Sequence, residues 1–229
     1  MEIGGFIKLS TIDFPEKLSC VVFLQGCNLK CIYCHNSHLI PFKKGIISQE
    51  SILSYIAENK EFLDGVVISG GEPLAQKDVC DFCKKVKELG LSIKIDTNGF
   101  FPEQLKKLIL LKLVDYVALD IKAPLTPEEY SFIAGVKITE NDIKKLKETI
   151  FILSSEKIQA EFRTTVLQDY HTLEKIEKIV SEIPENATYV LQQCILKEKI
   201  TSKEYIINIA NHLKNKYKEL TIKTRIYEI

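Results

Sequence analysis

The chain has 229 residues, and its 45% hydrophobic content is ample for a buried core, which argues against a disordered protein. Its 31 basic and 31 acidic residues cancel to zero formal net charge, so neither nucleic acid nor an anionic membrane is expected as a partner. The first residues lack the pattern of a secretory signal, and no apolar run is long enough to span a bilayer, so we expect a cytoplasmic protein.

Short β-rich runs alternate with helical patterns from one end of the chain to the other. The runs that we interpret as strands are apolar and rich in β-branched residues. They lie at residues 19–25, 65–70, 91–99, 115–123, 159–166, 188–194 and 220–228. Helices are expected where apolar residues recur at helical spacing. They lie near residues 48–59, 76–89, 102–111, 139–154, 172–182 and 202–214.

Six strand and helix units followed by a last strand predict an α/β fold with a mainly parallel sheet. The count is too small for a closed barrel of eight units, and it leaves a partial barrel and a doubly wound open sheet as alternatives. No linker, internal repeat or low-complexity segment divides the sequence. We therefore expect a single domain over residues 1–229.

Glycines and polar or charged residues gather at or near the C-terminal ends of the expected strands. They comprise the cysteine loop 26–36, SGGEP at 69–73, DTNG at 96–99, DIK at 120–122, Arg163, Gln192 and Gln193. Ligands bind at that end of the strands in both alternative architectures. One large site is the simplest interpretation.

The cysteine loop fits three metal patterns. Cys31, Cys34 and His35 form the C-x-x-C-H of a c-type haem attachment site. Zinc could bind if His35, His38 or a distant residue added a fourth ligand to the thiolates. Cys27, Cys31 and Cys34 alone could carry an iron-sulfur cluster in which one iron stays open to a substrate or cofactor. We favour the cluster, because the loop offers three thiolates without a clustered second pair and haem of this type is normally attached outside the cytoplasm.

The remaining cysteines complete no metal pattern. Seven cysteines, an odd number in a chain expected in a reducing compartment, fit metal ligation with spare thiols better than disulfides. Cys80 and Cys83 form a second C-x-x-C inside an expected helix, and we interpret them as small core residues. Cys194 receives no role. His171 and His212 are expected at surface positions near helix boundaries.

Each polar segment also has a purely structural interpretation. GGEP and DTNG can be tight turns, and Asp120 with Lys122 can be a solvated ion pair. As ligand groups, Glu72 can accept bonds from an ammonium, and Asp96 with Asp120 can bind ribose hydroxyls or a monovalent cation. Arg163 lies in an apolar strand context, where an unpaired arginine is costly, so we expect an anionic ligand or a carboxylate beside it.

Together these features resemble the radical S-adenosylmethionine (radical SAM) superfamily. Cys27, Cys31 and Cys34, with aromatic Tyr33 before the last, match its C-x-x-x-C-x-x-C cluster motif, and GGEP at 70–73 matches its methionine-amine motif. The segments STIDFPEKLSCVVFLQGCNLKCIYCHN, ISGGEPLAQ, DTNG, LDIKAP and EFRTTV look like the activating enzymes of glycyl radical proteins. The resemblance is strongest to the anaerobic ribonucleoside-triphosphate reductase activating family.

The resemblance implies a partial (β/α)6 TIM-like barrel and a [4Fe-4S] cluster on Cys27, Cys31 and Cys34, whose open iron chelates SAM. Reductive cleavage of SAM, with an electron donor such as flavodoxin or ferredoxin, would give a 5′-deoxyadenosyl radical. This radical would take hydrogen from a glycine of the partner, in the leading interpretation an anaerobic ribonucleoside-triphosphate reductase.

Cofactor contacts are carried over from the resemblance by position. They are expected from Tyr33, His35, Asn36, Gly70, Gly71, Glu72, Pro73, Asp96, Asn98, Asp120, Lys122, Arg163 and Gln192. Asp96, Thr97 and Asp120 match a monovalent-cation site of the pyruvate formate-lyase activase type.

Departures from the family pattern are few. Glu16 stands where glycine is expected in a DFPGK-like run, and Ile32 stands where proline is common. No cysteine lies between Cys34 and Cys80, so the ferredoxin-like insert of some activating enzymes is absent. The alternatives are a radical SAM enzyme that acts on another glycyl radical enzyme, a small molecule or RNA, and a zinc-binding interaction module without enzymatic activity.

Overall fold

The structure is a computed structural model that describes residues 1–196 and 199–227. The strands of the large sheet are β1 Ile3–Ser10, β2 Ser19–Leu24, β3 Gly65–Gly70, β4 Ser92–Thr97, β5 Tyr116–Asp120, β6 Gln159–Val166, β7 Thr188–Gln193 and β10 Thr221–Arg225. A separate two-stranded sheet pairs β8 Ile195–Leu196 with β9 Lys199–Ile200. The α-helices are α1 Gln49–Glu58, α2 Val79–Glu88, α3 Pro102–Leu110, α4 Pro127–Ala134, α5 Glu140–Ser155, α6 Leu173–Val180 and α7 Lys203–Lys216. Two short 3-10 helices are η1 Ser37–Leu39 and η2 Pro73–Ala75.

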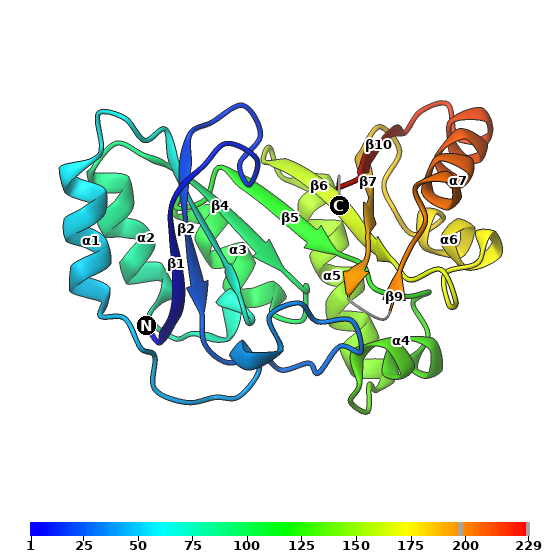
Figure 1. Ribbon diagram of the computed structural model, residues 1–229, viewed down its shortest axis with the longest axis horizontal. Helices are drawn as coiled ribbons and strands as arrows, with labels where there is room; N and C mark the ends of the chain where they lie inside the picture. Colours follow the sequence, from blue (N-terminus) through cyan, green and yellow to red (C-terminus); the bar gives the residue numbers. More distant parts are fainter. Residues whose placement is uncertain (197–198, 228–229) are drawn as a thin grey trace. The chain divides into compact units, whose positions relative to one another are not determined.

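The large sheet is mainly parallel (Figure 1). Its strand order is β1-β2-β3-β4-β5-β6-β7-β10. The β1 strand runs antiparallel to β2, whereas the pairs β2 with β3, β3 with β4, β6 with β7 and β7 with β10 are parallel. This arrangement confirms the expected α/β class with a mainly parallel sheet.

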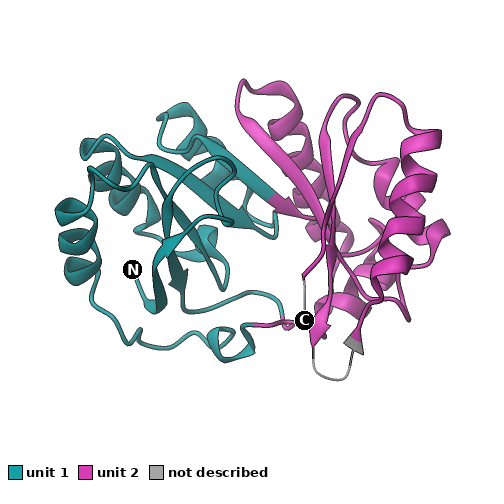
Figure 2. Cartoon of the chain, turned by 45° about the horizontal axis from the view of Figure 1, so that its top comes forward, with its two compact units in different colours: residues 1–29, 36–118 teal, residues 30–35, 119–229 magenta. Residues whose placement is uncertain are grey.

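The chain divides into two compact units (Figure 2). Unit 1 comprises residues 1–29 and 36–118, and unit 2 comprises residues 30–35 and 119–229. Unit 1 holds β1 to β4 and the first part of β5, and unit 2 holds the end of β5 and the later strands. The expectation of one domain over the whole chain stays a prediction.

Unit 1 is built around strands that are buried on both faces. The central residues of β2 and β3 are at most 1% exposed, as expected for parallel strands that are covered on each side. The α1 helix begins where the Ser48 side chain accepts a hydrogen bond from the Ser51 amide at 3.1 Å, and it lies beside α2 (Figure 1).

Unit 2 follows the same local rules. The longest helix, α5, begins with a capping box in which Thr139 and Asp142 each bind the other's backbone amide. The α7 helix packs on β7 and β10, and its buried residues Ile206, Ile209 and Leu213 recur at helical spacing.

Among the strands of the large sheet and the α-helices, β1 and α4 were not expected from the sequence. The β1 strand contains Gly4 and Gly5, residues that weaken strand patterns, and its buried residues do not alternate. The α4 helix carries clear signals in Thr126, which caps the helix by accepting the Glu129 amide, and in Pro127 at its first turn.

The expected last strand is shorter than 220–228, and residue 228 lies outside the described residues. No helix in the described part of the chain is long and apolar enough to cross a membrane.

Candidate active site

The first part of the cysteine loop belongs to unit 1, and its base is closed by main-chain hydrogen bonds. The Gly26 amide donates to the Leu39 carbonyl at 2.7 Å, and the Cys27 amide donates to the Ile40 carbonyl at 2.9 Å. Gly26 has φ +100, in the left-handed region that favours glycine. The backbone therefore holds Cys27 at a defined place directly after β2.

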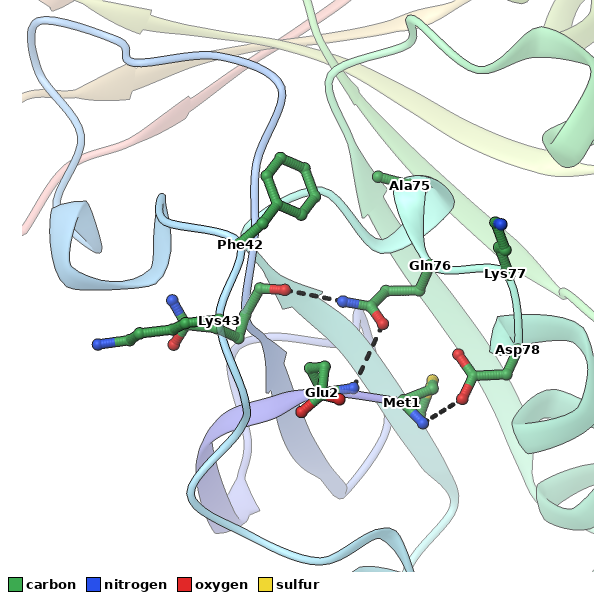
Figure 3. A pocket seen from close by; sticks show the side chains of 9 residues that line it. Met1, Glu2, Phe42, Lys43, Ala75, Gln76, Lys77 and Asp78 are labelled. Atoms are coloured by element: carbon green, nitrogen blue, oxygen red, sulfur yellow. Dashed lines mark hydrogen bonds and ion pairs between the residues drawn. The ribbon is translucent and has the colours of Figure 1, made fainter.

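Two glutamines form a second set of hydrogen bonds at the base of the loop. Gln25 donates from Nε2 to the Pro41 carbonyl at 2.7 Å, and Gln76 donates to the Gln25 carbonyl at 2.7 Å. Gln76 also accepts a bond from the Glu2 amide at 3.3 Å, across a cavity of about 400 Å³ (Figure 3). Among the described residues this cavity is lined by Met1, Glu2, Gln25, Phe42, Lys43, Ala75, Gln76, Lys77 and Asp78. None of the expected cofactor contacts lines it.

The glycine motif packs directly against the chain that leads into Cys27. The Gly71 amide donates to the Leu24 carbonyl at 2.8 Å, and the Glu72 amide donates to the Gly26 carbonyl at 2.9 Å. A Cβ atom on Gly71 would lie 2.1 Å from the Gly26 carbonyl oxygen. Gly70 has φ +101, which a residue with a side chain rarely adopts. Both glycines are therefore required by backbone geometry.

Glu72 joins the GGEP and DTNG segments. Its side chain is 1% exposed and accepts hydrogen bonds from the Thr97 hydroxyl at 2.7 Å and the Asn98 amide at 2.8 Å. It also caps η2 by accepting the Leu74 amide at 3.1 Å. Because buried carboxylates are costly without such bonds, Glu72 fixes the ends of β3 and β4 relative to each other.

Asn98 links the DTNG segment to the first cysteine. Its Nδ2 donates to Asn28 Oδ1 at 2.8 Å and lies 3.9 Å from the Cys27 sulfur. The same sulfur accepts the Leu29 amide at 3.4 Å. N–H groups directed at a cysteine sulfur favour the thiolate form that ligates iron.

Residues 30–35 of the cysteine loop belong to unit 2 and rest on α4. The Lys30 amide donates to the Ala134 carbonyl at 2.8 Å, and the Ile32 amide donates to the Ile133 carbonyl at 3.1 Å. Gly135 ends α4 with φ +63, and a Cβ atom there would lie 2.2 Å from the Lys30 carbonyl oxygen. The helix that the sequence did not predict is thus the support for Cys31 and Cys34.

Tyr33 lies in the interior of unit 2. Its ring is 6% exposed, and among the described residues its hydroxyl has no hydrogen-bond partner. Burial raises the pKa of Tyr33 well above its usual value, against the opposing effect of the Lys122 charge. Burial also raises the pKa of the Cys31 thiol, with Lys122 again opposing and Cys34 adding to the rise.

Asp120 ends β5 and is held by two cations of unit 2. Arg163 donates from Nε to one carboxylate oxygen at 2.8 Å, and Lys122 donates to the other at 3.1 Å. Burial alone would raise the pKa of Asp120, but the charges of Arg163 and Lys122 outweigh it and hold the pKa well below its usual range. The expected carboxylate beside Arg163 is therefore Asp120.

The charge pattern continues along the strands with a residue that the sequence did not single out. Glu161 is 3% exposed and lies 3.7 Å from Arg163 and 3.5 Å from Arg225. Arg225 in turn donates to the Gln192 side chain at 3.3 Å. Acidic and basic side chains thus alternate from Lys122 through Asp120, Arg163 and Glu161 to Arg225.

Tyr130 and His171 position the turn that carries Lys122. The Lys122 amide donates to the Tyr130 hydroxyl at 3.1 Å, and the Lys122 carbonyl lies 3.0 Å from His171 Nε2. His171 Nδ1 accepts the Leu167 amide at 2.8 Å, so the neutral ring carries its proton on Nε2. Burial lowers the pKa of His171 to about 4.

The surface position expected for His171 is wrong, because the residue is 0% exposed. Its partners lie 4 and 49 residues away in the sequence, and no local pattern predicts this burial. His212 lies at the surface as expected and pairs with Glu177 at 2.8 Å. Cys80 and Cys83 are buried in α2, as expected for core residues.

The other expected contacts lie at loops and strand ends. Asp96 accepts the Ser69 hydroxyl at 3.1 Å, Pro73 begins η2 and is buried, and Asn36 is half-buried at the start of η1. His35 is exposed, and partial desolvation lowers the pKa of its ring.

The residues of the cysteine loop fit an iron-sulfur cluster. Cys27, Cys31 and Cys34 are partly exposed and form no disulfide among the described residues. Within those residues no three Cys, His, Asp or Glu side chains converge as they would on a single ion. A cubane places each thiolate on a different iron, so its ligands do not meet at one atom. The N–H groups around the Cys27 sulfur suit such a ligand.

Comparison with known proteins defines the class of this protein. Residues 21–183 match the radical SAM superfamily. The matched region runs from β2 to the end of α6 and includes the cysteine loop, GGEP, DTNG, DIK and Arg163. The chain is a radical SAM enzyme, and this family uses a [4Fe-4S] cluster together with SAM.

Curated relatives identify the group of enzymes within the radical SAM superfamily to which this chain belongs. MJ1227 of Methanocaldococcus jannaschii, which is named as a glycyl-radical enzyme activating enzyme, is 39% identical over 83% of this chain and 79% of its own length. The pyruvate formate-lyase 1-activating enzyme of Escherichia coli is 31% identical over 58% of this chain and 56% of its own. Within the superfamily, the chain belongs to the activating enzymes of glycyl radical enzymes.

Solved structures show the same fold at low sequence identity. QueE from Escherichia coli is 14% identical with a TM-score of 0.56, over 97% of this chain and 93% of its own. Streptococcus suis SuiB bound to S-adenosylmethionine is 14% identical with a TM-score of 0.67, over 88% of this chain and 48% of its own. These neighbours support the expected partial-barrel fold class.

Proposed function

We propose that this activating enzyme generates the glycyl radical of an anaerobic ribonucleoside-triphosphate reductase. The observation that carries the proposal is the compact segment between β2 and β3. It holds the three-cysteine loop, η1 and α1, and no cysteine between Cys34 and Cys80 that could ligate a further cluster. The DTNG, LDIKAP and EFRTTV segments resemble the activating enzymes of glycyl radical proteins, and we take the compact cysteine segment as support for the reductase-activating type among them.

In this proposal Cys27, Cys31 and Cys34 hold the cluster. A reduced cluster held there would supply the one electron needed to break the sulfur to C5′ bond of SAM, which would release methionine and a 5′-deoxyadenosyl radical able to take a hydrogen atom from a glycine α-carbon. The products are 5′-deoxyadenosine and the glycyl radical. The electron comes from a reductant such as flavodoxin or ferredoxin.

The chain contributes binding, orientation and exclusion of water. Gly70 and Gly71 let the backbone approach the methionine amine, and buried Glu72 keeps this backbone in place through its bonds to β4. Lys122 has three N–H donors and donates one hydrogen bond to Asp120, so its ammonium has donors left to bind the SAM carboxylate. We assign the remaining contacts to Tyr33, His35, Asn36, Pro73, Asp96, Asn98, Arg163 and Gln192.

The test is an anaerobic activation assay. Reduced enzyme, SAM and an anaerobic ribonucleoside-triphosphate reductase should give a glycyl doublet in electron paramagnetic resonance, with 5′-deoxyadenosine formed in step. The matched control replaces the radical-bearing glycine of the reductase by alanine and should show SAM cleavage without a doublet. Cleavage of SAM without a radical on the wild-type reductase would overturn the assignment of this partner.

A second candidate partner is pyruvate formate-lyase. Activating enzymes named for it in Listeria monocytogenes are 36% identical over 53% of this chain. The assay is therefore run with both partners in parallel at equal concentration. The proposal expects the faster radical formation on the reductase, and faster formation on pyruvate formate-lyase would replace it.

A further inference from the structure

A lysine in the middle of β4 is almost completely buried. Lys94 has a side chain that is 1% exposed, and its ammonium forms a hydrogen bond to the Asp13 backbone carbonyl. The same ammonium lies 3.2 Å from an Asp96 carboxylate oxygen and 5.8 Å from the centre of the Tyr116 ring. A buried ammonium is costly unless opposite charge and hydrogen bonds compensate it. These contacts provide that compensation and make Lys94 and Asp96 an ion pair.

The Lys94 ion pair reaches the candidate site through Asp96. Lys94 and Asp96 are two residues apart on β4 and therefore point to the same face of the sheet. The Asp96 side chain is 17% exposed and accepts the hydroxyl of Ser69, the residue directly before the glycine motif. The ammonium thus lies deeper in unit 1 than a carboxylate that is one residue before the end of β4 and bonds to Ser69.

The residues expected to hold a dissolved monovalent cation are each engaged by the chain's own groups. Asp96 is paired with Lys94, and the Thr97 hydroxyl donates to Glu72 and accepts the Gly99 amide at 3.1 Å. In unit 2, Asp120 receives both Arg163 and Lys122, as described above. A second cation beside the Lys94 ammonium would meet like-charge repulsion.

We propose that Lys94 is a positioning residue whose ammonium supplies the positive charge at Asp96, in place of a dissolved monovalent cation. It holds the Asp96 carboxylate at the end of β4, next to Ser69 and the glycine motif, and so prepares the binding site for SAM. The proposal rests on the radical SAM assignment and is independent of the glycyl radical partner.

The test is the dependence of SAM binding on the monovalent cation, measured with the reconstituted enzyme and no partner protein. In buffers of equal ionic strength with potassium, sodium or tetramethylammonium, the wild-type Kd for SAM should change by less than about twofold. In Lys94→Met, Asp96 loses its counter-charge, and Kd should rise about tenfold in tetramethylammonium and recover in potassium along a saturable curve. The double variant Lys94→Met with Asp96→Asn should show no response to potassium.

Lys87→Met is the matched control. Lys87 also pairs with an aspartate of unit 1, Asp115 at 2.9 Å, and its loss should leave SAM binding and the cation response as in the wild type. A saturable potassium requirement in the wild-type enzyme would overturn the proposal, as would a Lys94→Met variant that binds SAM weakly in every buffer. The wild-type measurement needs no variant to fold, so the proposal stays testable if Lys94→Met is unstable. Loss of SAM binding by the wild-type enzyme in all buffers would instead contradict the radical SAM assignment on which the proposal rests.

Discussion

Each unit holds its own candidate site residues by a different physical means. In unit 1 the site residues are held mainly by main-chain contacts, in which Gly71 and Glu72 bind the backbone that leads into Cys27. In unit 2 the site residues are held by charges, in which Asp120 and Arg163 belong to a row of alternating acidic and basic side chains. Sterically defined backbone tolerates no added atom, whereas a charge network tolerates substitution only if the charges still balance.

This difference predicts which residues are sensitive to which change. Unit 1 should respond most to added volume at its glycines and little to changes of exposed charge. Unit 2 should respond most to the loss of a buried charge and to protonation.

Loss of the central cation in unit 2 should have the largest effect. Arg163→Met leaves Asp120 and Glu161 without their shared partner, and we expect the free energy of unfolding to fall by about 4 kcal/mol in urea titrations. Arg225→Met is the control, because Arg225 pairs with the same Glu161 but is 30% exposed, and its loss should cost about 1 kcal/mol. Equal losses of unfolding free energy in the two variants would show that the position of Arg163 between two carboxylates adds nothing to stability.

The pH dependence of stability should report His171. Burial lowers its pKa to about 4, so between pH 6.5 and 4 the unfolded chain binds a proton that the folded chain does not. Stability is therefore fully present above pH 6.5 and falls as the pH decreases, by up to about 3 kcal/mol at pH 4. His171→Gln should lose this slope, whereas His212→Gln, at the surface, should keep it. Parallel pH profiles for wild type and His171→Gln would contradict the assignment.

An added methyl group in unit 1 should act through shape. Gly71→Ala places a Cβ atom 2.1 Å from the Gly26 carbonyl, so we expect a loss of about 2 kcal/mol and weaker SAM binding in equilibrium dialysis. Gly90→Ala is the control, because no atom lies within 4 Å of the added Cβ and only its φ of +83 is strained. It should lose about 1 kcal/mol with unchanged SAM affinity. Wild-type SAM affinity in Gly71→Ala would refute the close-approach account.

Relief of strain at an exposed loop should give the smallest effect. Glu16 has φ +61, a left-handed conformation, at the position where the family pattern leads us to expect glycine. Glu16→Gly should therefore raise the melting temperature, with a gain in stability of up to about 1 kcal/mol. Glu50→Gly, at an exposed glutamate in the first turn of α1, should lose about 1 kcal/mol instead. A loss in both variants would show that position 16 is not strained.

The sequence was sufficient to predict the strands that are buried on both faces. Runs such as Val66 to Ile68 are continuously apolar, and this pattern is characteristic of parallel strands in an α/β fold. It was not sufficient for β1, because Gly4 and Gly5 obscure the strand pattern and its pairing with β2 is set by tertiary packing. The α4 helix could have been predicted from the sequence, since Thr126 and Pro127 are ordinary signals for the start of a helix.

Site residues could be predicted where they belong to a recognisable sequence motif. Asp120 and Arg163 were expected near a counter-charge, and the structure pairs them. His171 and Glu161 were beyond prediction, because their burial depends on segments distant in the sequence. Lys94 was also beyond prediction, because β4 reads SIKIDT, in which Ile93 and Ile95 alternate with polar residues as in a strand with one solvated face.

We infer that Cys27, Cys31 and Cys34 hold one cluster with an iron open to SAM. The most direct measurement is iron and sulfide analysis after anaerobic reconstitution, followed by electron paramagnetic resonance of the reduced protein with and without SAM. We expect about four irons and four sulfides per chain and a spectrum that changes when SAM is added. Cys27→Ser should lose the cluster, while Cys80→Ser, in the α2 core, should retain it. A colourless protein that holds one zinc ion per chain would contradict the claim.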